Sequence, residues 1–216
     1  MDNDRQALLH KLGVIPVIAI DSAEHALPLA DALIEGGLPA AEITFRTAAA
    51  ADAIRALRRE RPQLLVGAGT ILNVEQLREA KACGAAFGVA PGFNPDIVRQ
   101  AQAASLDFCP GVMTPSEIEN AMALGLNVLK FFPSELAGGL KMIKALAGPY
   151  GHTGLRFIPT GGVSEQNLEA YLAEKLVLAV GGTWIAKKES IAAGKWDEIR
   201  QNCRRAVEIV AKVRPA

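Results

Sequence analysis

Short apolar segments alternate along the whole chain with segments in which apolar residues recur every three or four positions. The apolar segments are six to eight residues long and rich in β-branched and aromatic side chains, as buried β-strands are. Their starts lie roughly 20 to 28 residues apart, which fits one strand plus one crossover helix. The pattern predicts eight strands, at residues 14–20, 41–46, 64–70, 86–91, 106–112, 127–133, 155–160 and 177–184.

Residues that start helices follow these apolar segments. Thr114-Pro-Ser-Glu117 combines an N-cap hydroxyl, a proline at the first helical position and the glutamate of a capping box. A helix is therefore predicted between one strand and the next, and continuous apolar strands favour a parallel sheet covered on both faces. Residues 2–12 and about 196–213 predict further helices at the two ends of the chain.

Eight strand–helix units predict a single (β/α)8 TIM barrel with an extra N-terminal helix, occupying residues 1–216 as one domain. An open, doubly wound α/β sheet is the alternative. It is disfavoured because the first strand is not followed by the G-x-G-x-x-G turn of a dinucleotide-binding fold.

Composition and charge exclude several classes of partner. Lys+Arg and Asp+Glu both number 23, so the net charge is zero, and no basic run suggests nucleic acid. No apolar run reaches the length of a membrane span, and the N-terminus is acidic and polar, unlike a signal peptide. The three cysteines are far apart and lack metal-ligand spacing, which fits a reducing cytoplasm. The three histidines are scattered, so we expect neither a metal nor a cofactor.

Lys130 is the unusual residue of the sixth apolar segment. It lies in the middle of Asn127-Val-Leu-Lys-Phe-Phe-Pro-Ser134, where burial disfavours the ammonium form. A neutral amine is what attacks a carbonyl carbon to form a Schiff base. Alternatively, the lysine lies near the end of the strand and its amine reaches water.

The second segment carries a polar face. Period-two alternation places Glu42, Thr44 and Arg46 on one side of the strand, with apolar residues on the other. An inward-facing charge in a barrel needs a partner or a ligand. A glutamate–arginine pair that only satisfies itself is the alternative.

Small residues end four of the predicted strands. Gly67-Ala-Gly-Thr70 and Ala90-Pro-Gly92 would let a ligand approach the backbone, although such glycines also serve ordinary turns. Pro159-Thr-Gly-Gly162 and Gly181-Gly-Thr-Trp184 follow the seventh and eighth strands, where barrels commonly bind phosphate through backbone N–H groups. A buried lysine, an inward carboxylate, an arginine and a phosphate site together predict carbon–carbon chemistry on a keto acid that carries a distant phosphate.

The sequence resembles the KHG/KDPG aldolases, which are class I 2-dehydro-3-deoxy-phosphogluconate aldolases. The specific matches are Glu42-Ile-Thr-Phe-Arg-Thr47 and Lys130-Phe-Phe-Pro133, and the similarity covers nearly the whole chain. The other matching stretches are Ile15-Pro-Val-Ile18, Val66-Gly-Ala-Gly-Thr70, Ala90-Pro-Gly92, Pro159-Thr-Gly-Gly162 and Gly181-Gly-Thr-Trp184.

The resemblance implies a role for each matching residue. Lys130 would be the Schiff-base lysine and Glu42 the proton-transfer residue. The pyruvyl end of the substrate would be bound by Arg46 and Thr70, in a pocket lined by Pro91 and Phe132. The phosphate end would be surrounded by Thr160, Gly161, Gly162, Gly181, Gly182 and Thr183. The resemblance also implies a cytoplasmic homotrimer that acts on a small keto-acid phosphate and needs no metal.

Departures from the family pattern bear on the substrate. Thr183 stands where the family often has serine, Phe45 where leucine is common, and Val128-Leu129 where a glutamate and a phenylalanine often precede the lysine. Thr160 favours the phosphogluconate substrate, and 4-hydroxy-2-oxoglutarate is a possible second substrate. The alternatives are an aldolase for the phosphogalactonate epimer, an isomerase or epimerase that uses Glu42 as base, and a barrel that only binds sugar phosphates.

Overall fold

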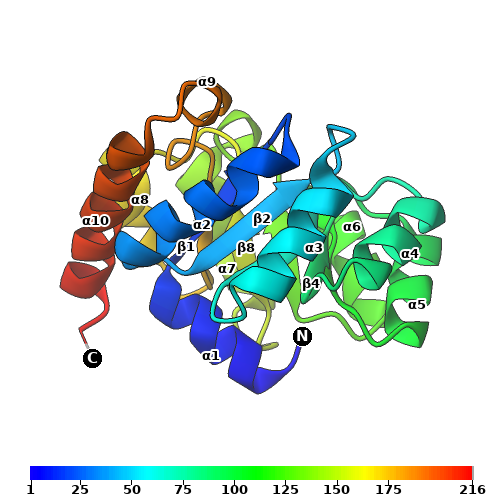
Figure 1. Ribbon diagram of the computed structural model, residues 1–216. Coiled ribbons are helices and arrows are strands. Elements are labelled where there is room, and N and C mark those ends of the chain that lie inside the picture. The colour runs from blue at the N-terminus through cyan, green and yellow to red at the C-terminus, as the bar shows by residue number, and fades with distance from the viewer. Residues whose placement is uncertain (216) are drawn as a thin grey trace.

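The computed structural model describes residues 1–215, in which parallel strands lie inside a layer of helices (Figure 1). The strands are β1 (Val14–Ile18), β2 (Ala40–Thr44), β3 (Leu65–Gly69), β4 (Phe87–Val89), β5 (Asp107–Cys109), β6 (Gly111–Val112), β7 (Val128–Phe131), β8 (Arg156–Pro159) and β9 (Val180–Gly182). The helices are α1 (Asn3–Leu12), α2 (Ala26–Glu35), α3 (Ala50–Glu60), α4 (Val74–Ala82), α5 (Pro95–Ala103), α6 (Pro115–Ala123), α7 (Gly139–Tyr150), α8 (Glu165–Leu172), α9 (Lys188–Ala192) and α10 (Trp196–Val213). Two 3-10 turns, η1 (Ala23–His25) and η2 (Glu135–Ala137), complete the elements.

The strands form two separate sheets, so the prediction of a closed eight-stranded TIM barrel is wrong. Six strands pair in the order β5-β4-β3-β2-β1-β9, and three pair in the order β6-β7-β8. Every strand pair is parallel, as the continuous apolar segments predicted. The larger sheet is half of a barrel, and the smaller sheet stands against it.

The breaks between the sheets have local causes. On one side, Pro110 interrupts the predicted fifth strand, because a proline offers no N–H to a neighbouring strand. β5 therefore pairs with β4, and β6 pairs with β7. On the other side, β8 and β9 are not paired as strands within residues 1–215; the isolated bridges Phe157↔Val177 and Thr160↔Gly181 join the two chain segments there.

The start of α6 follows the predicted capping chemistry. Thr114 and Glu117 form the complete capping box at the start of α6, with Pro115 at its first position. α1 is the predicted N-terminal helix, capped by the Asp2 side chain, which accepts from the Arg5 N–H at 2.7 Å. α10 spans Trp196–Val213, as the amphipathic pattern predicted.

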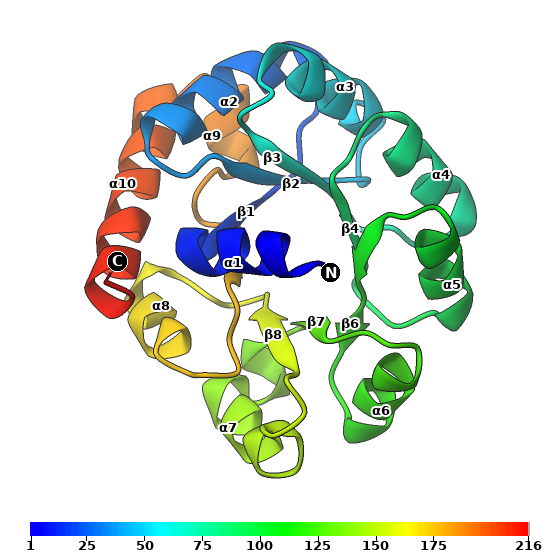
Figure 2. The same ribbon diagram turned by 90° about the horizontal axis from the view of Figure 1, so that it is seen from below.

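Two groups of buried apolar side chains hold these layers together. The larger group fills the space between the strands and the outer helices. The smaller group lies inside the strands and draws side chains from both sheets and from α1: Leu9, Ile15, Phe87, Val89, Cys109, Val128, Ile158, Leu178 and Ala179. Figure 2 shows α1 lying across the middle of the strands, with the other helices around the outside. α1 therefore covers the amino ends of the strands and leaves the carboxyl ends for a site.

Candidate active site

Lys130 and Glu42 come together across the gap between the two sheets. Lys130 lies in β7 of the three-stranded sheet and Glu42 in β2 of the six-stranded sheet. The Lys130 Nζ is 3.7 Å from the Glu42 Oε1, and the side chains are only 7% and 4% exposed. The distance is too long for a good hydrogen bond but within the range of an ion pair. A water-sized or carbonyl-sized group could therefore bridge an amine and a carboxylate that are both largely removed from solvent.

The Glu42 carboxylate is held close to the backbone of the neighbouring strand. A side chain at Gly69 would place its Cβ 2.1 Å from the Glu42 Oε1, so only glycine fits there. Within residues 1–215 that buried oxygen accepts no hydrogen bond. A buried oxygen without a partner is costly, and it is therefore poised to accept a proton from a bound molecule.

Apolar and sulfur groups surround the Lys130 amine. Its Nζ is 5.2 Å from the centroid of the Phe132 ring, close enough for a cation–π contact when the amine is protonated. Cys109, at the carboxyl end of β5, also faces this interior. Burial raises the pKa of the Cys109 thiol to about 12, so the thiol is neutral near pH 7 although Lys130 lies near enough to favour the thiolate. The sequence analysis did not select Cys109, although its alternation with Asp107 in the same strand places it on the inner face.

Arg46 lies beyond the carboxyl end of β2, outside the buried surroundings of Lys130 and Glu42. β2 ends at Thr44, two residues before the predicted end, and Arg46 is exposed in the turn that follows. Its Nε still donates to the Thr44 Oγ1 at 3.0 Å, and that hydroxyl donates to the Ile18 carbonyl at 2.8 Å. Arg46 therefore does not continue the inward polar face of the strand as predicted, although its side chain is held beside Thr44 at the strand end.

Thr70 has a backbone conformation that threonine rarely adopts. Its φ of +60° lies in the left-handed region, which is strained for a β-branched residue. It follows β3 directly, one residue after the glycine that touches Glu42. Pro91 follows β4 and is half-buried; a side chain on Gly111 would come within 2.1 Å of its carbonyl oxygen. Strain of this kind concentrates at functional sites, so Thr70 belongs to the candidate site on structural grounds as well.

The two glycine pairs after β8 and within β9 lie close to each other. Thr160 is buried and bridges to Gly181, where an added Cβ would be 2.2 Å from the Thr160 Oγ1. Gly161 and Gly162 have φ values of +94° and +84°, which favour glycine. Within the described residues neither of their N–H groups donates to an acceptor in the chain. These two donors can therefore bind an anion.

The remaining predicted residues lie next to the two glycine pairs. Phe132 is half-buried, and its ring lies 3.4 Å from where a Cβ on Gly161 would be. The ring therefore lies between Lys130 and the glycine loop, which is the name used here for residues 160–162. Gly182 is packed under the Trp184 ring, which leaves no room for a side chain. Thr183 is exposed at the end of β9. The predicted site residues thus all lie at the carboxyl ends of the strands, from the lysine–glutamate pair to the second glycine pair.

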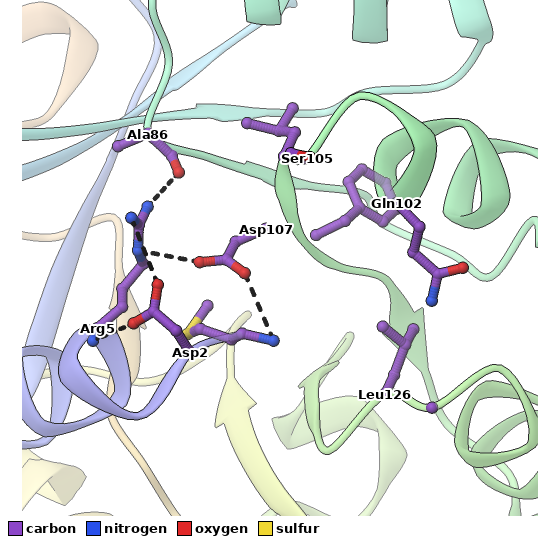
Figure 3. A pocket seen from close by; sticks show the side chains of 11 residues that line it. Asp2, Arg5, Ala86, Gln102, Ser105, Asp107 and Leu126 are labelled. Atoms are coloured by element: carbon purple, nitrogen blue, oxygen red, sulfur yellow. Dashed lines mark hydrogen bonds and ion pairs between the residues drawn. The ribbon is translucent and has the colours of Figure 1, made fainter.

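A different hollow of about 380 Å³ lies at the amino ends of the strands (Figure 3). There the Arg5 Nε is 3.0 Å from Asp107, and the amino group of Met1 is 3.5 Å from the same carboxylate. Arg5 also donates to the Ala86 carbonyl oxygen. These charges satisfy one another and tie α1 to the strands, so this hollow is not the candidate site.

The described residues contain no group of three or more His, Cys, Asp or Glu side chains placed to hold a metal ion. In the same part of the chain, no helix combines the length and the apolar character that crossing a bilayer requires.

A buried polar cluster lies beside the loop of residues 160–162 and was not predicted from the sequence. Ser134 and Tyr171 are almost fully buried, and their hydroxyl oxygens are 2.9 Å apart. The Tyr171 hydroxyl also donates to the Glu135 carboxylate. The position of Ser134 after Phe132-Pro133 was visible in the sequence, but nothing in the sequence placed Tyr171, which lies 37 residues away, beside it.

Comparisons with known proteins point to one family. Residues 6–202 match the family model described as KDPG and KHG aldolase. The 2-dehydro-3-deoxy-phosphogluconate aldolase of Haemophilus influenzae is 48% identical over 202 residues, which cover 94% of each chain. The KHG/KDPG aldolase of Escherichia coli is 44% identical over 90% of this chain and 91% of its own. The structure of the KDPG aldolase from Legionella pneumophila, with pyruvate captured as a covalent carbinolamine intermediate, aligns with a TM-score of 0.88. That alignment has 38% identity and covers 92% of this chain and 96% of the other.

Proposed function

The chain belongs to the KDPG and KHG aldolase family, and we therefore propose that it is a class I aldolase. Its substrate would be 2-dehydro-3-deoxy-6-phosphogluconate, which is cleaved into pyruvate and glyceraldehyde 3-phosphate. The observation that carries the proposal is the buried Lys130 Nζ, 3.7 Å from a carboxylate oxygen that has no hydrogen-bond partner in the described chain.

The first half of the reaction uses both members of this pair. The neutral Lys130 amine attacks the C2 carbonyl carbon of the keto acid and forms a carbinolamine. Glu42 relays protons as the carbinolamine loses water and becomes a protonated imine. A hydroxyl that lies beside the pair can be within hydrogen-bond distance of both Nζ and Oε1 and can exchange protons with them.

The second half breaks the C3–C4 bond. Removal of the C4 hydroxyl proton lets that bond break, because its electron pair moves into the protonated imine and leaves an enamine. Glyceraldehyde 3-phosphate departs, C3 of the enamine takes up a proton, and hydrolysis releases pyruvate and the free amine. Glu42 moves the protons in these steps, a role that typically contributes about 10²–10⁴-fold to the rate.

The substrate would lie across the carboxyl ends of the strands, with its pyruvyl end and its phosphate end held by different residues. Arg46 and Thr70 would hold the pyruvyl carboxylate, with Pro91 and Phe132 against the carbon chain. The phosphate would lie on the backbone N–H groups of Gly161, Gly162, Gly181 and Gly182, near Thr183. The unused N–H groups of Gly161 and Gly162 support this assignment.

Thr160 bears on the choice of epimer. It is buried next to Gly181, and its only acceptor in the described chain is the Ile158 carbonyl at a long 3.4 Å. The hydroxyl therefore remains available for a substrate hydroxyl, which favours the gluconate form over the galactonate epimer. We also propose 4-hydroxy-2-oxoglutarate, which would yield pyruvate and glyoxylate, as a second substrate, because it shares the pyruvyl end.

The proposal also covers the oligomeric state, the domain organisation and the cellular compartment of the protein. We propose a homotrimer because the resemblance to the family implies one; Leu136, Leu72 and Met113, which follow β7, β3 and β6 and are 91%, 56% and 41% exposed, are apolar side chains that a subunit contact would bury. A single domain is supported by one cluster of buried apolar side chains whose members come from most of the chain, from Val14 to Val210. Three buried free thiols support a reducing cytoplasm.

Borohydride trapping tests the central assignment. The protein incubated with pyruvate and reduced should gain the mass of one reduced adduct, and peptide mapping should place it on Lys130. Lys130→Met keeps the apolar stem and should take no label, whereas Lys144→Met, in α7, should be labelled like the wild type. An adduct on Lys141 or Lys144 of the wild-type protein would contradict the assignment.

A further inference from the structure

The loop that follows β7, here called the β7 loop, contains Ser134 and Glu135. It sets the orientation of two peptide groups in the glycine loop, residues 160–162. The Ser134 N–H donates to the Thr160 carbonyl at 2.8 Å, and the Glu135 N–H donates to the Gly161 carbonyl at 3.0 Å. In a trans peptide the C=O and the N–H of the next residue point in opposite directions. Because the two carbonyls point at the β7 loop, the N–H groups of Gly161 and Gly162 point away from it. The β7 loop thereby leaves both N–H groups free to bind the phosphate.

Tyr171 binds the side chains of two residues in this β7 loop, Ser134 and Glu135. Its single hydroxyl hydrogen is donated to the Glu135 carboxylate, so the Ser134 hydroxyl must donate to the Tyr171 oxygen. The phenol is neutral near pH 7, because burial and the hydrogen bond to Glu135 raise the pKa of Tyr171 to about 12. One oxygen atom on α8 thus binds the two residues whose N–H groups orient the glycine loop.

Two glycines make room for this contact. A Cβ on Gly162 would lie 2.4 Å from the Glu135 Cγ, and a Cβ on Gly139 would lie 2.8 Å from the Glu135 Oε1 and 3.1 Å from the Tyr171 hydroxyl oxygen. Both glycines have positive φ values, +84° and +57°. Asn167, also on α8, holds the other side of the glycine loop by donating to the Gly162 carbonyl at 3.2 Å. The loop is therefore fixed from two positions of a single helix.

We propose that Tyr171 is a positioning residue for the phosphate end of the substrate, acting through Ser134 and Glu135 on the N–H groups of Gly161 and Gly162. The proposal rests on the proposed function. The Tyr171 hydroxyl bonds to Ser134 and Glu135, which places it in the second layer behind the glycine N–H groups and apart from Lys130. Its removal should therefore impair the recognition of phosphate while the chemistry at the pyruvyl end continues.

Tyr171→Phe tests this with a matched control. It removes one hydroxyl and leaves the ring packing, and Tyr150→Phe removes an equivalent tyrosine–glutamate bond, the one to Glu119 at 3.0 Å, on α7. We expect kcat/KM for the phosphorylated substrate to fall about 10- to 100-fold in Tyr171→Phe, mainly through KM. Cleavage of the unphosphorylated analogue should change less than about three-fold, and Tyr150→Phe should leave the ratio of the two substrates unchanged.

Two further variants examine the route through the β7 loop. Glu135→Gln keeps an acceptor for the Tyr171 hydroxyl and should preserve the substrate ratio, whereas Glu135→Leu should lower it as Tyr171→Phe does. Equal losses for both substrates in Tyr171→Phe, or a ratio equal to that of the wild type, would overturn the proposal. Each comparison is made well below the melting temperature of every variant.

A separate measurement distinguishes this proposal from the proposed function. Solvent deuterium entering the methyl group of pyruvate reports enamine formation and needs no phosphate. Exchange should persist in Tyr171→Phe at close to the wild-type rate. If wild-type protein itself exchanged no deuterium, the aldolase assignment would fail; normal exchange with an unaltered substrate ratio in Tyr171→Phe would refute only the positioning role.

Discussion

Each end of the parallel strands carries an ion pair, and the two pairs differ in burial and in the number of their hydrogen-bond and ion-pair partners. At the carboxyl ends, Lys130 and Glu42 are 7% and 4% exposed and 3.7 Å apart, with a glutamate oxygen that has no hydrogen bond within residues 1–215. At the amino ends, Arg5 and Asp107 are 24% and 20% exposed and 3.0 Å apart, and both have additional partners. The first pair is poorly satisfied and buried, and the second is well satisfied and partly hydrated.

Under the proposed function, this difference distinguishes the reactive pair Lys130–Glu42 from the structural pair Arg5–Asp107. A buried charge that lacks hydrogen bonds costs folding free energy, and the protein retains it where a bound molecule will use it. A partly exposed pair contributes a modest amount to stability and fastens α1 across the strand ends. Substitutions at the carboxyl end should therefore change activity, and substitutions at the amino end should change stability.

Glu42→Gln should produce the largest effect. It keeps the size of the side chain but removes the group that accepts protons, so kcat should fall by about 10²–10⁴-fold while pyruvate still binds. Steady-state kinetics and pyruvate titration measure the two quantities. Glu119→Gln, on α6, is the control and should keep wild-type turnover. Wild-type turnover in Glu42→Gln would show that the carboxylate does not act as a general base.

Thr160→Val should produce an intermediate effect that depends on the substrate. It removes a buried hydroxyl at nearly constant volume, and it should cost the phosphogluconate substrate about 1–3 kcal/mol in kcat/KM. The galactonate epimer should lose less or gain. Thr153→Val, which removes a hydroxyl bonded to the Tyr150 carbonyl, is the control. The measurement is kcat/KM for both epimers, and an epimer ratio that stayed constant would exclude Thr160 from stereochemical recognition.

Arg5→Ala should produce the smallest effect, and only on stability. It removes the ion pair with Asp107 and the hydrogen bond to Ala86, which together should lower the free energy of unfolding by about 1 kcal/mol. Urea denaturation measures this change, and kcat/KM should stay at the wild-type value. Arg55→Ala, which breaks an exposed pair within α3, should change stability by less than about 0.5 kcal/mol. A large loss of activity in Arg5→Ala with intact stability would remove the distinction between the two ends.

Much of the architecture could be predicted from local patterns. The order of strands and helices, the capping box at Thr114, the terminal helices and the parallel pairing all follow from periodicity and capping, which act over a few residues. Lys130 was identifiable because a charge in an apolar strand conflicts with its surroundings. The closed barrel was a wrong prediction, because period and strand count do not say where neighbouring strands fail to pair, as they do at Pro110.

The sequence by itself determined which residues are candidates for the chemistry, because unusual side chains at strand ends are visible in the order of the amino acids. Only the tertiary structure decided which of them meet. Lys130 faces Glu42 from a different sheet, and Tyr171 reaches Ser134 from a helix 37 residues away. Such contacts depend on how whole layers pack and twist against one another, and neither packing nor twist has a local signature in the order of the amino acids.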